Sequence, residues 1–218
     1  MMRKSVLSFF LAFSVVALAG GCVKLSKPYP DVSHYLIELP SGSGEAVAAP
    51  LDRSLTVRPF TVSPAFDKQG FVYRRLDGKG GAGEYVEDFY VRHLVAPHEA
   101  IEAATRTWLA EAGLFRHVSG PSSIQAADMV LEGHLRRLYV ATDSSAKDAR
   151  AAVLELELAF FDLSDQAPKT VSTHTISVAK EIDDTRPETI VRAWSEALEE
   201  GLRGAATTLT ETAPPVEP

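Results

Sequence analysis

The clearest strand pattern in the chain lies in residues 151–163, where apolar and charged side chains alternate. Leu154, Leu156 and Leu158 take every second position, and glutamates stand between them. Because successive side chains of a strand point to opposite faces of a sheet, this alternation predicts a strand with one buried and one solvent-facing side. Residues 169–179, which are rich in Thr, Val and Ile, are expected to pair with it as a hairpin.

Weaker strand patterns occur in five other segments, namely residues 33–39, 54–62, 70–75, 84–90 and 127–140. Pro59 interrupts the second of these and predicts an edge strand or a bulge, because proline cannot donate to a strand ladder. The glycine-rich residues 77–83 separate the third segment from the fourth and predict a hairpin with a flexible tip. Arg136 and Arg137 interrupt the last segment and indicate a slip between the two faces of its strand.

Two segments show the period of an amphipathic helix. Residues 97–112 carry Trp108 on an apolar stripe, and Gly113 directly after them suits the position that ends a helix. Residues 186–209 carry Trp194 on a second apolar stripe. Both tryptophans are therefore expected to be buried between the helices and the sheet.

The order of these elements predicts the fold class. Runs of strands separated by single helices are typical of one α+β domain, which we expect to span residues 33–209. Its sheet is expected to be mostly antiparallel, with the two amphipathic helices packed on one face. Residues 210–218 are rich in Pro, Thr and Glu and are expected to form a disordered tail.

The N-terminal segment has the pattern of a bacterial export signal. Residues 1–21 combine two basic residues, a short apolar run and small residues directly before Cys22, which is the only cysteine in the chain. This pattern predicts a lipoprotein signal peptide, with Cys22 acylated as the first mature residue and residues 22–32 serving as a lipidated tether. The alternatives are an ordinary signal peptide followed by an incidental cysteine, and a buried structural cysteine.

The residue after Cys22 predicts which of the two membranes holds the lipid anchor. In enteric bacteria an aspartate at this position retains a lipoprotein in the inner membrane, and here the position holds Val23. We therefore expect an outer-membrane anchor facing the periplasm, and consider the inner membrane second. Stable anchoring requires more than one acyl chain, and a triacylated N-terminus supplies three.

The net charge of the mature chain argues against nucleic acid as a partner. The signal segment holds two of the 22 basic residues and none of the 29 acidic ones, so the mature chain carries a formal net charge of −9. Nucleic-acid binding requires a basic face, and this balance argues against it. Electrostatic docking on anionic lipid is disfavoured for the same reason.

The sequence contains no motif that carries catalytic chemistry. His93 and His98 are the closest histidine pair, and five residues is not a helical metal-binding spacing. Gly78-Lys79 lacks the remaining residues of a phosphate-binding loop, and no nucleophile elbow is present. We therefore expect no enzyme activity, no metal and no cofactor.

The order and spacing of several short segments are those of a known family. These segments follow Cys22 and are His34-Tyr35-Leu36-Ile37-Glu38-Leu39, Leu55-Thr56-Val57-Arg58-Pro59-Phe60, Phe71-Val72-Tyr73-Arg74, the aromatic strand from Glu84 to Tyr90, and Ala112-Gly113-Leu114-Phe115. With the later strand pair and long C-terminal helix, the chain resembles the ABC-type transport auxiliary lipoproteins, the PqiC-type proteins associated with MCE-domain lipid transporters.

This resemblance implies an accessory role in moving lipids between the two membranes of the cell envelope. The expected partners are an MCE-domain protein and ABC transporter subunits, which would supply the nucleotide site and the permease. Formation of a homo-oligomer is left open. The alternatives are a lipid-binding or envelope-assembly lipoprotein that acts independently of a transporter, and a membrane-tethered enzyme.

An accessory protein needs an exposed contact surface. The sequence offers the glycine-rich hairpin tip and the strand edge near the interrupting proline, since mobile tips reorder at little cost and free edges accept a partner strand. The alternative is that the tip varies in length without a role. The candidate partner contacts are Pro59, Asp77, Gly78, Lys79, Gly80 and Gly81.

Overall fold

The computed structural model describes residues 31–44, 50–76, 83–143, 149–165 and 167–212. The chain divides into two units, Met1–Asp31 and Val32–Pro218, and the architecture below is that of the second unit.

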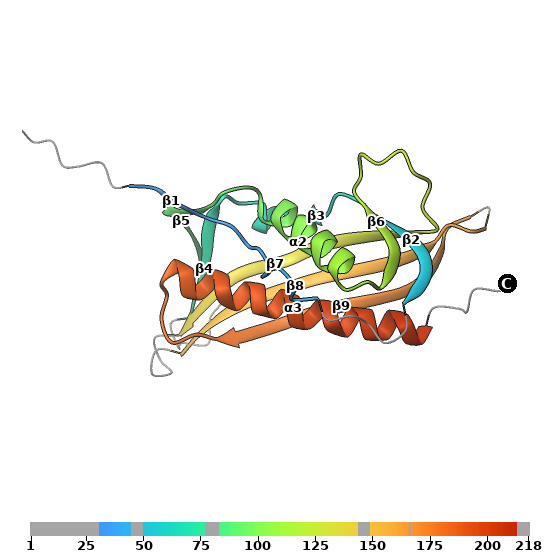
Figure 1. The fold of residues 1–218 in the computed structure, drawn as a ribbon. Coiled ribbons are helices and arrows are strands. Elements are labelled where there is room, and N and C mark those ends of the chain that lie inside the picture. Colours follow the sequence, from blue (N-terminus) through green and yellow to red (C-terminus); the bar gives the residue numbers. More distant parts are fainter. Residues whose placement is uncertain (1–30, 45–49, 77–82, 144–148, 166, 213–218) are drawn as a thin grey trace, which may run out of the picture. The chain divides into compact units, whose positions relative to one another are not determined.

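The described residues of this unit form a curled nine-stranded sheet with two long helices on one face (Figure 1). The strands are β1 Ser33–Tyr35, β2 Leu51–Val57, β3 Thr61–Val62, β4 Gly70–Leu76, β5 Glu84–His93, β6 Phe115–Ser119, β7 Met129–Asp143, β8 Ala149–Asp162 and β9 Lys169–Glu181. The helices are the short η1 Pro64–Phe66, then α2 Pro97–Glu111 and α3 Pro187–Thr212. The α+β class is therefore confirmed.

Strand β7 occupies the centre of the sheet. Along one edge it pairs in parallel with β2, β3 and β4 in succession, where Leu55, Thr61 and Tyr73 lie opposite Met129, His134 and Val140. Along the other edge it pairs antiparallel with β8, which pairs antiparallel with β9. The sheet is thus mixed, and the expectation of a mostly antiparallel sheet is wrong, because three short strands run in the same direction along one edge of a long one.

The slip of face predicted at the paired arginines is a bulge in β7. The register between β7 and β8 shifts between Leu135 and Arg137, so Arg136 is the extra residue. Both arginines consequently point to the exposed face, where Arg136 bonds Glu157 at 2.7 Å and Arg137 bonds Glu155 at 3.0 Å. A strand without this bulge would turn one of the two guanidinium groups into the core.

The core lies between the sheet and the two helices. Trp108 of α2 and Trp194 of α3 are both buried, which confirms the prediction for the two apolar stripes. The Trp194 indole meets the Phe71 ring edge-on, with centroids 5.2 Å apart. Gly113 adopts a φ of 64° directly after α2, as a helix-ending glycine does.

Some boundaries differ from those that the sequence predicts. Strand β1 ends at Tyr35, and Leu36–Leu39 continue as extended chain outside the sheet. Strand β6, which the sequence analysis did not identify, pairs in parallel with β2. Helix α3 continues through Thr212, so the first three residues expected in the tail are helical. Residues 213–218 lie outside the described residues.

Phe60 fixes the chain between β2 and β3. Its ring is buried and lies over Gly133 of β7, where a β-carbon would stand 2.5 Å from a ring atom. Only a residue without a side chain permits this approach.

His93 is buried at the end of β5 among aromatic rings. Its ring lies 4.6 Å from the Phe71 ring and 5.8 Å from the Trp194 ring, measured between centroids. Burial disfavours the charged imidazolium and lowers the pKa of His93 to about 4.

We predict that Gly133→Ala destabilises the domain by about 1–3 kcal/mol, because the new methyl group must displace the Phe60 ring. Chemical denaturation of the mature protein measures this cost. In a Phe60→Leu background the same substitution should cost clearly less, since a smaller side chain can yield. Equal costs in the two backgrounds would contradict the contact.

We predict that stability falls between pH 6.5 and pH 4 on account of His93. In the unfolded chain this imidazole takes up a proton near its ordinary pKa of 6.5, whereas in the folded protein it does so only near pH 4. The loss at the acid end of the window should reach about 3 kcal/mol. His93→Phe should remove this part of the pH dependence in denaturation curves, and an unchanged slope would argue against it.

Candidate functional site

Most of the residues singled out in the sequence cannot be placed. Cys22 and the hairpin-tip residues 77–81 lie outside the described residues. The strands that flank the tip, β4 and β5, do pair antiparallel, with Arg75 opposite Glu84. The hairpin is therefore confirmed, and the role of its tip stays a prediction.

Pro59 stands in the break between β2 and β3 and is exposed. The ladder to β7 resumes on either side of it, through the Arg58 N–H to the Leu131 carbonyl and the Ser63 N–H to the Leu135 carbonyl. Within the described part of the chain, β3 pairs with β7 alone, so its outer edge carries no strand. The proline thus lies beside a very short free edge.

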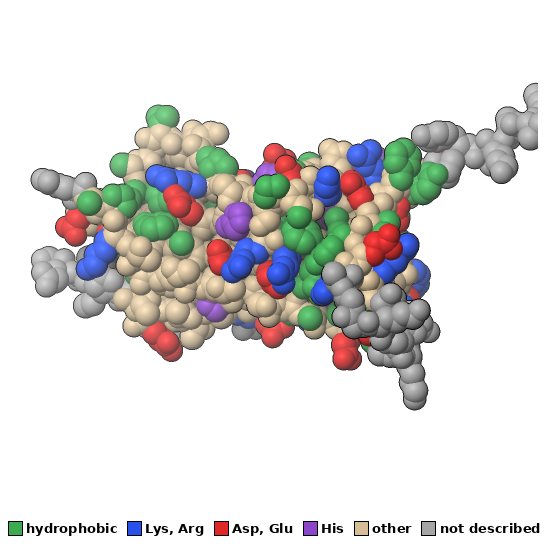
Figure 2. Space-filling view, turned by 180° about the vertical axis from the view of Figure 1, so that it is seen from behind, with side chains coloured by type: hydrophobic (Ala, Val, Ile, Leu, Met, Phe, Trp, Pro, Cys, Tyr) green, Lys and Arg blue, Asp and Glu red, His purple; other side chains and the backbone are tan. Residues whose placement is uncertain are grey.

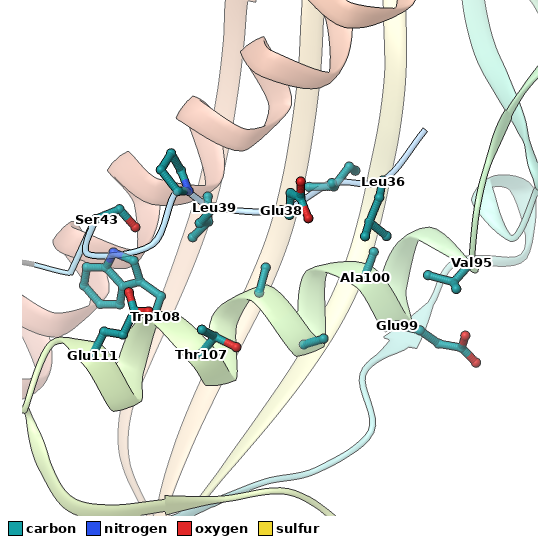
Figure 3. A pocket seen from close by; sticks show the side chains of 14 residues that line it. Leu36, Glu38, Leu39, Ser43, Val95, Glu99, Ala100, Thr107, Trp108 and Glu111 are labelled. Carbon is teal, nitrogen blue, oxygen red and sulfur yellow. The ribbon is translucent and has the colours of Figure 1, made fainter. Parts of the chain in front are cut away.

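An apolar groove runs between α2 and the extended chain that follows β1 (Figure 3). Its volume is about 510 Å³, within the range of small-molecule sites. Alanines form the α2 wall, and Leu36 and Leu39 form the opposite wall. The lining residues are Leu36, Ile37, Glu38, Leu39, Pro40, Ser43, Val95, Glu99, Ala100, Ala103, Ala104, Thr107, Trp108 and Glu111.

Five of the fourteen lining residues are polar, namely Glu38, Ser43, Glu99, Thr107 and Glu111. The indole N–H of Trp108 and the hydroxyl of Ser43 are buried and have no hydrogen-bond partner among the described residues. Figure 3 shows these two side chains near each other at one end of the groove. Glu111 at the same end accepts a hydrogen bond from the Gly42 N–H at 2.9 Å. The site is therefore a mainly apolar groove that also carries the exposed carboxylates of Glu38, Glu99 and Glu111.

A second apolar feature is the β5 patch, which we define as Phe89, Tyr90, Leu94 and Val95. All four side chains are exposed, and five of the six large hydrophobic side chains that are exposed in the described residues lie between positions 85 and 95. The Phe89 and Tyr90 rings meet edge-on with centroids 5.2 Å apart. Val95 also lines the groove, so the two apolar surfaces adjoin.

The strongest polar cluster has a structural role. The Asp128 carboxylate accepts hydrogen bonds from the Ser54 N–H at 2.7 Å and the Ser54 hydroxyl at 2.8 Å. These bonds, together with Arg116, lower the pKa of Asp128 below its ordinary value. The cluster ties β2 and β6 to the residue before β7. Nowhere in the described ranges do three His, Cys, Asp or Glu side chains gather as metal ligands would.

In the part of the chain that the structure describes, neither long helix has the length and apolarity needed to cross a bilayer.

The chain matches no protein-family model, and no curated protein matches it either. Its fold is similar to that of protein XCC0632 from Xanthomonas campestris, a DUF330 protein, with 18% identity over 83% of this chain and 96% of that one and a TM-score of 0.63. A second solved structure, of an uncharacterized protein, is 12% identical over 81% of this chain and 97% of that one, with a TM-score of 0.58. Hypothetical protein CT253 from Chlamydia trachomatis is 4% identical over 74% of this chain and 99% of that one, with a TM-score of 0.54. At these identities the likeness concerns the fold alone.

The sequence analysis did not identify the groove or the β5 patch. The groove depends on Leu36–Leu39 lying outside the sheet, although their pattern is that of a strand. The β5 patch could have been suspected from the adjacent residues Phe89 and Tyr90, because two successive side chains of a regular strand cannot both face the core.

Proposed function

We propose that this protein is a lipid-anchored accessory component of an intermembrane lipid transport system, held in the outer membrane by Cys22 and facing the periplasm. The observation that supports this most is the fold. The succession of strands, helix, strands and long helix on which the family resemblance rests is the succession found along the chain. The similarity of fold to a DUF330 protein is compatible with the same assignment.

In this proposal the protein acts by contact rather than by turnover. An MCE-domain protein and the ABC transporter subunits are the partners, and they supply ATP hydrolysis and the lipid path. The hairpin tip at residues 77–81 and the short free edge beside Pro59 are the proposed contacts. The Arg–Glu pairs on the sheet face opposite the helices give this face a polar character suited to a water-filled compartment.

We predict that the mature lipoprotein, purified from native membranes in mild detergent, brings down an MCE-domain protein and its transporter subunits. Cys22→Ala should move the protein to the soluble fraction or leave its signal uncleaved, and should abolish this co-purification from membranes. Replacing residues 78–83 by an Asn-Gly turn tests the proposed contact in a chain that keeps its anchor. Co-purification of no envelope transporter with the wild-type chain would overturn the proposal.

The groove favours a second candidate function, that of an independent lipid-binding lipoprotein. Its walls are mainly apolar, and its volume is within the range of small-molecule sites and suits one acyl chain. In this alternative the protein carries or senses a lipid without a transporter.

We predict for this alternative that non-covalently bound lipid co-purifies with the mature chain and that Ala103→Trp reduces it several-fold by filling the groove. Ala103 lines the groove and is exposed, so the larger side chain should not disturb folding. The matched control is Ala110→Trp, an exposed position on the same helix that does not line the groove. Mass spectrometry of extracted lipid measures the effect, and equal lipid in both variants would eliminate this function.

A further inference from the structure

We propose that the β5 patch rests on the surface of the phospholipid bilayer that holds the Cys22 anchor, and thereby fixes the orientation of the domain. This inference rests on the proposed lipidation and goes beyond it, because a lipid on a tether holds a domain near a membrane without orienting it.

The patch places three large exposed hydrophobic side chains within six residues of the chain. The exposed fractions are 60% for Phe89, 45% for Tyr90 and 59% for Leu94. Single exposed hydrophobic residues are common on proteins, whereas a contiguous group of large ones marks an interaction site. Figure 2 shows hydrophobic side chains exposed at the end of the domain where Figure 1 places β1 and β5.

A bulge in β5 builds the aromatic pair. Glu87 pairs with Val72 and Arg92 pairs with Gly70, so residues 88–91 lie opposite a single residue of β4. The Asp88 carboxylate holds the extra loop by accepting hydrogen bonds from the Tyr90 N–H at 2.7 Å and the Val91 N–H at 3.1 Å. The adjacent rings are thereby presented together, whereas a regular strand would point them to opposite faces.

The chain enters the domain beside this pair. Ser33, at the start of β1, lies opposite Val91 of β5. Cys22 stands ten residues before Val32, and ten residues of fully extended chain span at most ~36 Å. The anchor therefore keeps the bilayer within ~36 Å of the point of entry, and the β5 patch is an apolar surface next to that point.

The chemistry of the patch suits uncharged lipid headgroups. Phenylalanine and leucine favour the hydrocarbon boundary, and tyrosine places its ring there with its hydroxyl in the headgroup region. Arg92, the nearest arginine, already donates to the Gln69 side chain at 2.8 Å. Because the chain is acidic overall, attraction to anionic lipid contributes little, and the contact should be insensitive to salt.

The test uses the lipidated full-length mature chain in vesicles of phosphatidylcholine and phosphatidylethanolamine. Acylation blocks the Cys22 thiol, so Phe89→Cys introduces the single free thiol for a nitroxide label. Ile124→Cys is the matched control, because Ile124 is 102% exposed and lies in the β6–β7 loop at the opposite end of the domain from β5 (Figure 1). Collision rates with oxygen and with a water-soluble nickel complex report whether each label lies in lipid.

We expect the ratio of oxygen to nickel collisions to be several-fold higher at position 89 than at position 124, at low and at high salt. The substitutions Phe89→Ser and Tyr90→Ser together should return a label at Leu94→Cys to the aqueous ratio, whereas Ile124→Ser should not. All variants should float with vesicles and melt like the wild type.

Two results would overturn the proposal. Equal aqueous ratios at positions 89 and 124 in protein that floats would show that the anchor exists and that the patch faces water or another protein. Failure of the wild-type chain to float would show that the chain has no membrane anchor. Both the proposed membrane attachment and this orientation would then be wrong.

Discussion

Backbone pairing along both edges of β7 is the interaction on which the rest of the domain depends. One edge aligns β2, β3 and β4 in succession, and the other carries β8 and, through it, β9. The bulge at Arg136 lets this long strand keep one face apolar along its length. Helix α2 packs on β6 and β7, and α3 packs on β8 and β9, so β7 touches one helix itself and aligns the strands that carry the other.

The candidate surfaces follow from where this sheet ends. Because β4 and β5 form a hairpin on one edge of β7, β5 is free to bulge outward and to take β1 as its neighbour. After Tyr35 the chain leaves the sheet and runs beside α2, which creates the groove. The Tyr35 hydroxyl donates to the Glu188 carboxylate at 2.8 Å and ties this entry strand to the start of α3. The β5 patch and the groove thus both adjoin the stretch of chain that begins with β1.

The sequence predicts the elements whose pattern is local and strong. The Leu–Glu alternation of β8, the stripes of α2 and α3 and the double arginine of β7 each indicate the structure found. Strand direction could not be predicted in this way, because alternation is the same in parallel and antiparallel pairs. Leu36–Leu39 are rich in residues that favour strands and yet lie outside the sheet. The bulge in β5 depends on the Asp88 side chain rather than on hydrophobic pattern.

The central claim is that this domain works from a lipid anchor at Cys22, since both the accessory role and the oriented surface depend on it. Intact mass measurement of the mature protein from native membranes, with sequencing of its N-terminus, tests this directly. The account predicts a chain that begins at Cys22 and carries the added mass of a diacylglyceryl group and an amide-linked acyl chain. A mature chain that begins elsewhere, or one with an unmodified Cys22, would contradict it.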